Sequence, residues 1–279
     1  GSGKSSLINL VPRFYDATQG EVLVDGVNVR DYTLKALRDK IGYVPQQSFL
    51  FKGTIASNVS YGDNPLDTTD AGIVDMTDTS TAAGRKREKE LIATQNEHRT
   101  LTSEQRADVR NACEVAQATE FIATKEKQYD SAISQGGSNV SGGQKQRLSI
   151  ARAVYRHPEI LIFDDSFSAL DFKTDRAVRD ALAKEAKDST KLIVAQRIGT
   201  IMDADRIVVL DDGKVVGQGT HSELLENCDV YRQIAQSQLS EDELNGGKSG
   251  ESKLPGETGK PIETGKPSVE SELNESEGR

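Results

Sequence analysis

The chain has 279 residues and a formal net charge of −9 at pH 7, with 35% hydrophobic and 5% aromatic residues. This length suffices for one or two domains, and the acidic balance argues against electrostatic capture of nucleic acid. Two cysteines and three histidines lie scattered, without a metal-ligand pattern, which favours a reduced, cytosol-facing domain.

The chain opens on GSGKSS, the second part of the phosphate-binding pattern G-x-x-x-x-G-K-[ST]. Glycines let backbone N–H groups curl around phosphate oxygens at the start of a helix. Lys4 would neutralise the β- and γ-phosphates, and the Ser5 hydroxyl would hold Mg²⁺. The expected phosphate-binding residues are Gly1, Ser2, Gly3, Lys4, Ser5 and Ser6. Because the chain begins inside this motif, we expect it to be a fragment that lacks any membrane part.

Short apolar runs rich in β-branched residues alternate with helical patterns, which predicts an α/β fold with a largely parallel sheet. The run Ile160–Phe163 is apolar on both faces, which is typical of a central strand covered by helices. The predicted strands are Glu21–Val24, Ile41–Val44, Ile160–Phe163, Lys191–Val194, Ile207–Leu210 and Lys214–Val216. The predicted helices begin at Lys4, at Ala107, at Gly142 and near Lys173.

Two helix caps and two polar segments complete the expected organisation. Thr102 to Gln105 form a capping-box pattern, and Ser141 can cap a helix that stops before Pro158. Residues 64–103 are polar and carry a mixed-sign charge run, so we expect an insert with a solvated loop and a short helix, with partner docking as the alternative. Residues 240–279 hold ten acidic and five basic residues and little apolar surface, which predicts a disordered acidic tail after an ATP-binding domain at 1–239.

Two further patterns indicate nucleotide chemistry. The strand Ile160–Phe163 ends in Asp164 and Asp165, and Asp164 in this position would reach Mg²⁺ through water. The segment 140–147, VSGGQKQR, places small residues at a helix N-terminus, where backbone N–H groups and a hydroxyl can meet phosphate. The residues of this signature segment are Ser141, Gly142, Gly143 and Gln144.

These motifs resemble the ATP-binding domain of ABC transporters of the bacterial exporter type, from Gly1 to about Gln238. The resemblance implies a P-loop NTPase core with a parallel central sheet, an antiparallel β part and an inserted α-helical subdomain at about 55–155, truncated at the N-terminus. It also implies ATP and Mg²⁺ as cofactors, and a head-to-tail dimer in which each signature segment contacts the partner's nucleotide. Gln46 matches the Q-loop glutamine, which contacts Mg²⁺ and the membrane domain, and Asp171 matches the D-loop.

Three positions depart from the usual exporter pattern. Asp165 stands where the family has a catalytic glutamate, and its side chain is shorter by about 1.5 Å, one C–C bond. Gln196 stands in place of the switch histidine and cannot become cationic. Gln135 stands where exporters usually carry glutamate, six residues before Ser141.

Asp165 together with Gln196 resembles the degenerate-site subunit of heterodimeric multidrug exporters. We therefore expect these two residues to form a site that binds ATP but hydrolyses it poorly, with Ser5, Gln46 and Asp164 around the metal. The intact signature segment would complete the site of a partner half-transporter. The resemblance implies a fused upstream transmembrane domain and a place at the cytoplasmic face of the cell membrane.

Several alternatives remain open on the sequence. The chain could be a homodimeric exporter ATPase with a slow Asp165 base, an importer-type ATPase or a binding-only pseudoenzyme. Chromosome-maintenance and DNA-repair ATPases share the signature segment, but they separate their nucleotide motifs by a long coiled coil. The stretch between Lys4 and Ser141 contains no sustained heptads, which argues against that class.

Overall fold

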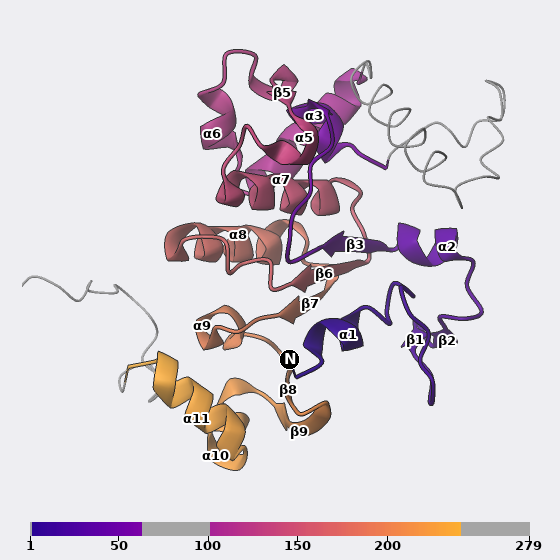
Figure 1. Ribbon diagram of the computed structural model, residues 1–279, viewed down its shortest axis with the longest axis vertical. Coiled ribbons are helices and arrows are strands. Elements are labelled where there is room, and N and C mark those ends of the chain that lie inside the picture. The colour runs from indigo at the N-terminus through magenta and orange to yellow at the C-terminus, as the bar shows by residue number, and fades with distance from the viewer. Residues whose placement is uncertain (1, 63–100, 241–279) are drawn as a thin grey trace, which may run out of the picture. The chain divides into compact units, whose positions relative to one another are not determined.

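A computed structural model describes residues 2–62 and 101–240 (Figure 1). The described residues form one compact unit. Gly1, nearly all of the predicted polar insert and the predicted acidic tail beyond Ser240 lie outside the described residues, so the expectations for them stay predictions.

The helices and strands of the described residues are, in chain order, α1 (Lys4–Ile8), β1 (Leu23–Val24), β2 (Val27–Asn28), α2 (Leu34–Asp39), β3 (Ile41–Val44), β4 (Gly53–Thr54), α3 (Ile55–Val59), α5 (Ser103–Val115), α6 (Thr119–Ala123), η2 (Gln128–Asp130), β5 (Ala132–Ile133), η3 (Gln135–Gly137), α7 (Gly142–Tyr155), β6 (Ile160–Asp164), α8 (Phe172–Glu185), β7 (Thr190–Val194), α9 (Ile198–Ile201), β8 (Ile207–Asp211), β9 (Lys214–Gly219), α10 (His221–Asn227) and α11 (Asp229–Gln238).

The predicted strands correspond to β1, β3, β6, β7, β8 and β9, although β1 is two residues long rather than four. Helices α1 and α7 begin at the predicted residues, and α8 begins at Phe172. The prediction of a helix start at Ala107 was wrong, because α5 begins one turn earlier. The Thr102 side chain accepts from the backbone N–H of Gln105, and the Gln105 side chain accepts from Thr102, so this capping box starts the helix.

The central sheet consists of three parallel strands in the order β3-β6-β7. Alternate residues of β6 enter two different clusters: Leu161 and Phe163 pack with residues of α7 and α8, whereas Ile162 packs with residues near β1, β2 and α2. Figure 1 shows α7 and α8 on one side of this sheet and α1 on the other. Both faces of β6 are therefore covered, as its sequence predicted.

Around this sheet lie three antiparallel strand pairs, β1-β2, β4-β5 and β8-β9, and a group of helices, α3, α5 and α6, next to α7 (Figure 1). Helix α7 approaches β3 closely at Gly42, where a Cβ atom would lie 2.7 Å from the carbonyl oxygen of Ala153. Only glycine fits this contact without a shift of the backbone. The arrangement agrees with the predicted parallel core, antiparallel part and inserted helical subdomain.

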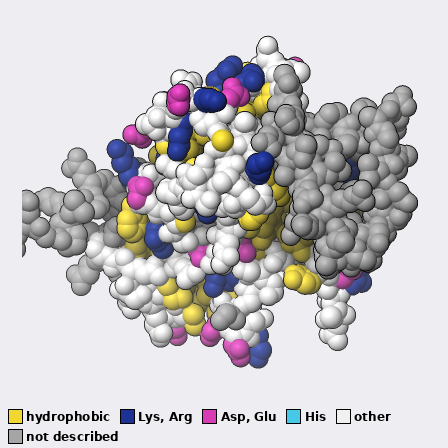
Figure 2. Space-filling model, turned by 45° about the horizontal axis from the view of Figure 1, so that its top comes forward, with side chains coloured by type: hydrophobic (Ala, Val, Ile, Leu, Met, Phe, Trp, Pro, Cys, Tyr) yellow, Lys and Arg dark blue, Asp and Glu magenta, His cyan; other side chains and the backbone are white. Residues whose placement is uncertain are grey.

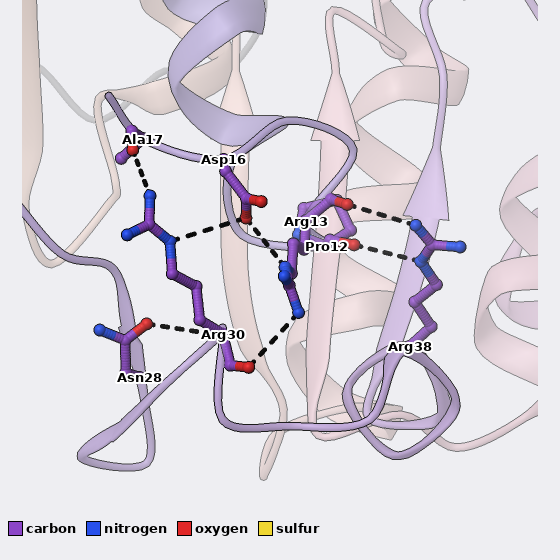
Figure 3. Close-up of polar contacts among 7 residues, drawn as sticks. All are labelled: Pro12, Arg13, Asp16, Ala17, Asn28, Arg30 and Arg38. Carbon is purple, nitrogen blue, oxygen red and sulfur yellow. Dashed lines mark hydrogen bonds and ion pairs between the residues drawn. The ribbon is translucent and has the colours of Figure 1, made fainter. Parts of the chain in front are cut away.

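Arginine side chains fasten the segment after α1 to the region around β2 and α2 (Figure 3). Arg38 donates to the carbonyl oxygens of Pro12 and Arg13, at 3.2 and 3.3 Å. Arg13 in turn pairs with Asp16 at 2.8 Å and donates to the carbonyl oxygen of Arg30 at 3.4 Å. These contacts hold the segment that follows α1 in sequence, and they therefore support the position of α1.

On the face that Figure 2 shows, basic and acidic side chains are interspersed over the described residues. Such a surface offers no extended basic stripe for a nucleic-acid backbone on that face. Within the described ranges, no helix is both long and apolar enough to cross a membrane.

Arg152 of α7 joins the signature helix to the segment that contains α3. Its guanidinium donates to the Asn58 carbonyl oxygen at 2.8 Å, the Asn58 Oδ1 at 2.9 Å and the Phe49 carbonyl oxygen at 2.9 Å. Burial lowers the pKa of Arg152 to about 10, so the group remains cationic at neutral pH.

Replacing Arg152 with alanine is expected to lower the free energy of unfolding by about 3 kcal/mol, because the charged donor is lost and its acceptors on Asn58 and Phe49 are left without this partner. That change corresponds to a fall of roughly 6–12 °C in the melting temperature, which thermal unfolding of the purified full-length protein would measure. Arg176→Ala is the matched control, since its pair with Asp180 is long, at 3.9 Å, and exposed. Equal stability of the two variants would contradict a bridging role for Arg152.

Candidate nucleotide site

The candidate site is a cavity of about 300 Å³ at the carboxyl ends of the parallel strands. Parallel strands end at the same edge of a sheet, so residues that follow β3, β6 and β7 meet there, beside the start of α1. The cavity brings together residues from the predicted phosphate-binding, Q-loop, base and switch positions. Its lining consists of Ser2, Gly3, Lys4, Ser5, Ser6, Gln46, Asp165, Val194 and Gln196.

The turn before α1 places the start of this helix at the cavity. Gly3 has a φ of 85°, in the left-handed region that glycine adopts without steric cost. The Lys4 ammonium donates to the Ser2 hydroxyl at 2.9 Å. The backbone therefore turns sharply where a phosphate-binding loop requires it, and a lysine lies within the same turn.

Asp164, the last residue of β6, is not among the lining residues and is only 6% exposed. The Ser5 hydroxyl donates to its Oδ1 atom at 2.8 Å, which joins the phosphate-binding motif to the strand-end carboxylate across 159 residues of sequence. On the other side, the Tyr43 hydroxyl lies 3.3 Å from Oδ2. Two of the predicted metal residues, Ser5 and Asp164, are thus in direct contact.

Asp165 directs its carboxylate to the two glutamines of the cavity. It has a φ of 49°, a left-handed conformation that aspartate tolerates better than most residues, and its backbone N–H donates to Val194 at 3.0 Å. Its Oδ2 atom accepts from the Gln196 amide at 2.7 Å and from the Gln46 amide at 3.1 Å. The predicted switch and Q-loop glutamines therefore converge on one oxygen atom of the predicted base.

The chemistry of these groups fits a hydrated divalent cation. Asp164 and Asp165 are both nearly buried, and across residues 2–62 and 101–240 neither carboxylate forms an ion pair. Their side-chain hydrogen-bond partners among the described residues are neutral hydroxyls and amides, so no ion pair there balances the two adjacent carboxylates. The described residues contain no cluster of three His, Cys, Asp or Glu ligands. Mg²⁺ usually keeps several waters and takes only one or two carboxylates from a protein.

The signature and D-loop residues do not line this cavity. Ser141 is the exposed N-cap of α7, where a capping box joins it to Gln144, and a Cβ atom at Gly142 would meet open space. Asp171 is the N-cap of α8, and the backbone N–H and hydroxyl of Thr174 hold its pKa below the usual range. Neither residue therefore contributes to the cavity of its own chain.

The sequence departure at Gln135 lies in a contact of the helical part. Its side-chain oxygen accepts from the backbone N–H of Lys52 at 3.1 Å, so it joins the start of η3 to the chain ahead of β4. Gln135 is not among the residues that line the cavity.

Two residues at the site were not predicted, Tyr43 and Asn9. The Tyr43 hydroxyl lies between Asp164 and Asn9 Oδ1, which is 2.9 Å away. The available signal was a tyrosine in the otherwise buried strand β3, since a half-buried phenol normally finds a polar partner. The sequence did not indicate which partner it would find.

The sequence model of a family described as ABC transporter matches residues 1–168. An uncharacterized ABC transporter ATP-binding protein of Mycobacterium tuberculosis (strain H37Rv) is 42% identical over 238 residues, which are 85% of this chain and 34% of that protein. The ATP-dependent lipid A-core flippase of Vibrio vulnificus (strain YJ016) is 40% identical over 241 residues, 86% of this chain and 35% of the flippase. This chain thus spans about a third of the length of these relatives.

Among solved structures, a bacterial Atm1-family ABC exporter with ATP bound superposes with a TM-score of 0.68 at 32% identity. The superposition covers 86% of this chain and 36% of the exporter chain. This chain therefore shares its fold with about a third of the exporter chain.

Proposed function

This chain belongs to the ABC transporter family, and we propose that it binds ATP with Mg²⁺ in the cavity at the strand ends and powers export across a membrane. The proposal is supported by the convergence of Lys4, Ser5, Gln46 and Asp165 around one cavity, with Asp164 in direct contact with Ser5. The similarity to a flippase and to an exporter favours export over import.

In this proposal the ATP-binding domain works with a transmembrane domain and lies at the cytoplasmic face of the membrane. Two such domains close head to tail, and each signature segment completes the other domain's site. The exposed position of Ser141 at the start of α7, away from its own cavity, supports contact in trans.

We further propose that this chain's own site hydrolyses ATP slowly. The observation that carries this step is the double amide contact at Asp165 Oδ2. A carboxylate oxygen offers about two lone-pair positions, and both are used by amide N–H groups that cannot take up a proton. An attacking water would have to displace one glutamine or use the other oxygen of a side chain that is already short.

Slow hydrolysis at this site favours a heterodimer. General-base catalysis typically contributes roughly 10²–10⁴ in rate, so a poorly placed base leaves ATP bound with little turnover. Bound ATP would still hold two domains together, because a ligand that prefers the closed state shifts the equilibrium toward it. A partner half-transporter with glutamate and histidine at these positions would then supply the turnover.

Reconstitution of the full-length chain by itself tests this proposal. We expect the protein to bind ATP and to show little turnover, which a coupled phosphate-release assay would measure. Rapid turnover that disappears in Asp165→Asn would contradict the degenerate site and favour a homodimer with an aspartate base. Absence of ATP binding would contradict the proposed function as a whole.

A further inference from the structure

A hydrogen-bonded chain of three side chains ends on Asp164. Asn9 is the C-cap of α1, Tyr43 lies in β3 and Asp164 ends β6. The Tyr43 hydroxyl lies 2.9 Å from Asn9 Oδ1 and 3.3 Å from Asp164 Oδ2. The two contacts connect positions that are 34 and 121 residues apart in sequence.

The direction of the chain follows from counting protons. Tyr43 has a single hydroxyl proton, and the Asp164 carboxylate can only accept. With Asn9 Oδ1 facing Tyr43, the shorter contact is the one to Asn9, at 2.9 Å against 3.3 Å to Asp164. A hydrogen bond to a charged acceptor is stronger than one to a neutral amide, which favours Asp164 as the acceptor once the Asn9 amide is turned. A half-turn of the Asn9 amide presents its N–H group to the Tyr43 oxygen, so that Asn9 donates to Tyr43 and Tyr43 donates to Asp164.

The Tyr43 ring is held independently of its hydroxyl. Phe14 packs edge-on against it, with ring centroids 5.3 Å apart, and Arg38 lies 5.3 Å from the centroid of the Phe14 ring. Burial, together with the charge of Asp164, raises the pKa of Tyr43 to about 12, so the hydroxyl keeps its proton at physiological pH. A phenylalanine at this position would retain the ring contacts and lose only the donor.

We propose that Tyr43, supported by Asn9, is a positioning residue that orients the Asp164 carboxylate toward a divalent cation bound with nucleotide. Ser5 and Tyr43 hold opposite oxygens of Asp164, at 2.8 and 3.3 Å. If Ser5 turns its hydroxyl to the cation, the contact with Tyr43 is the side-chain hydrogen bond that still holds this carboxylate within the described part of the chain. This inference rests on the proposed binding of ATP with Mg²⁺.

The test is Tyr43→Phe in the full-length protein, studied by thermal-shift titration with ATP. Without Mg²⁺, in EDTA, the ATP affinity of the variant should stay within about twofold of the original protein. With saturating ATP, the Mg²⁺ concentration for half-maximal stabilisation should rise about tenfold, as expected when the outer partner of a metal-binding carboxylate is lost.

Tyr32→Phe is the matched control, because the Tyr32 hydroxyl donates to the carbonyl oxygen of Val24 at 3.1 Å and is not part of the cavity. It should leave the Mg²⁺ titration unchanged. Asn9→Ala should shift the titration in the same direction as Tyr43→Phe but less, and the double variant should shift it no further than Tyr43→Phe alone.

An unchanged Mg²⁺ titration in Tyr43→Phe would overturn the proposal. A loss of ATP affinity in EDTA as large as the shift in the Mg²⁺ titration would also overturn it, because that result indicates a general structural role. If Tyr43→Phe does not fold, Asn9→Ala decides by the same titration. If the unsubstituted protein does not bind ATP, the proposed function is contradicted instead. Failure of the Tyr43 proposal and failure of the proposed function can thus be told apart.

Discussion

Asp165→Glu combined with Gln196→His is expected to raise ATP turnover of the full-length chain by about 10²-fold, the lower end of what a general base contributes. Glutamate extends the carboxylate by about 1.5 Å toward the cavity. Histidine replaces an amide that can only donate to Asp165 Oδ2, and its second ring nitrogen can exchange a proton. Phosphate release from the reconstituted chain alone measures the gain, because its own intact signature segment can complete the site of a second copy.

The control for this gain is Asp165→Asn, which keeps the size of the side chain and removes the carboxylate. It should abolish the residual turnover of the original protein while ATP binding persists. If the double variant turns over ATP no faster than the original chain, the two departures do not explain a slow site, and the degenerate-site proposal is wrong.

We expect Gly142→Asp to lower turnover by about 10²-fold or more when it is added to the faster Asp165→Glu, Gln196→His variant. Its negative charge would face a phosphate of the nucleotide that the other domain binds. The chain itself tolerates the change. A Cβ atom at Gly142 meets nothing within 4 Å, and an acidic residue is favourable in the first turn of a helix. Phosphate release gives turnover, and binding of fluorescent ATP should remain unchanged.

Gly199→Asp is the matched control, since it also lies in the first turn of a helix and has open space around a Cβ atom. It should leave turnover near that of the faster background.

A mixing experiment then separates contact in trans from contact within one chain. A Lys4→Ala chain keeps its signature segment, and a Gly142→Asp chain keeps its phosphate-binding loop, so a mixture restores one complete site. A mixture as inactive as either chain alone would place the signature contact within a single chain.

The strand ends illustrate how much of the site could be predicted from the sequence. The apolar run before Asp164, the glycine-rich turn before Lys4 and the glutamine after β3 each carry a local pattern, and parallel strands bring their carboxyl ends to one edge. The structure places Ser5 against Asp164 and Gln46 against Asp165, as this rule implies. Some element boundaries differed, since β1 is shorter than predicted and α5 begins earlier, and the short helices α2, α3, α6, α9, α10 and α11 were not predicted. Helices of this length depend on packing rather than on their own propensity.

The sequence by itself determined the family, the α/β core and the identity of the residues that could meet a nucleotide, because each is expressed in neighbouring residues or in a strand-turn-helix pattern. Only the tertiary structure decided that Gln46 and Gln196 share one oxygen of Asp165, and that Tyr43 and Asn9 reach Asp164. Those contacts join residues between 31 and 121 positions apart. Their geometry depends on how side chains from separate elements pack, and no local pattern in the chain encodes that arrangement.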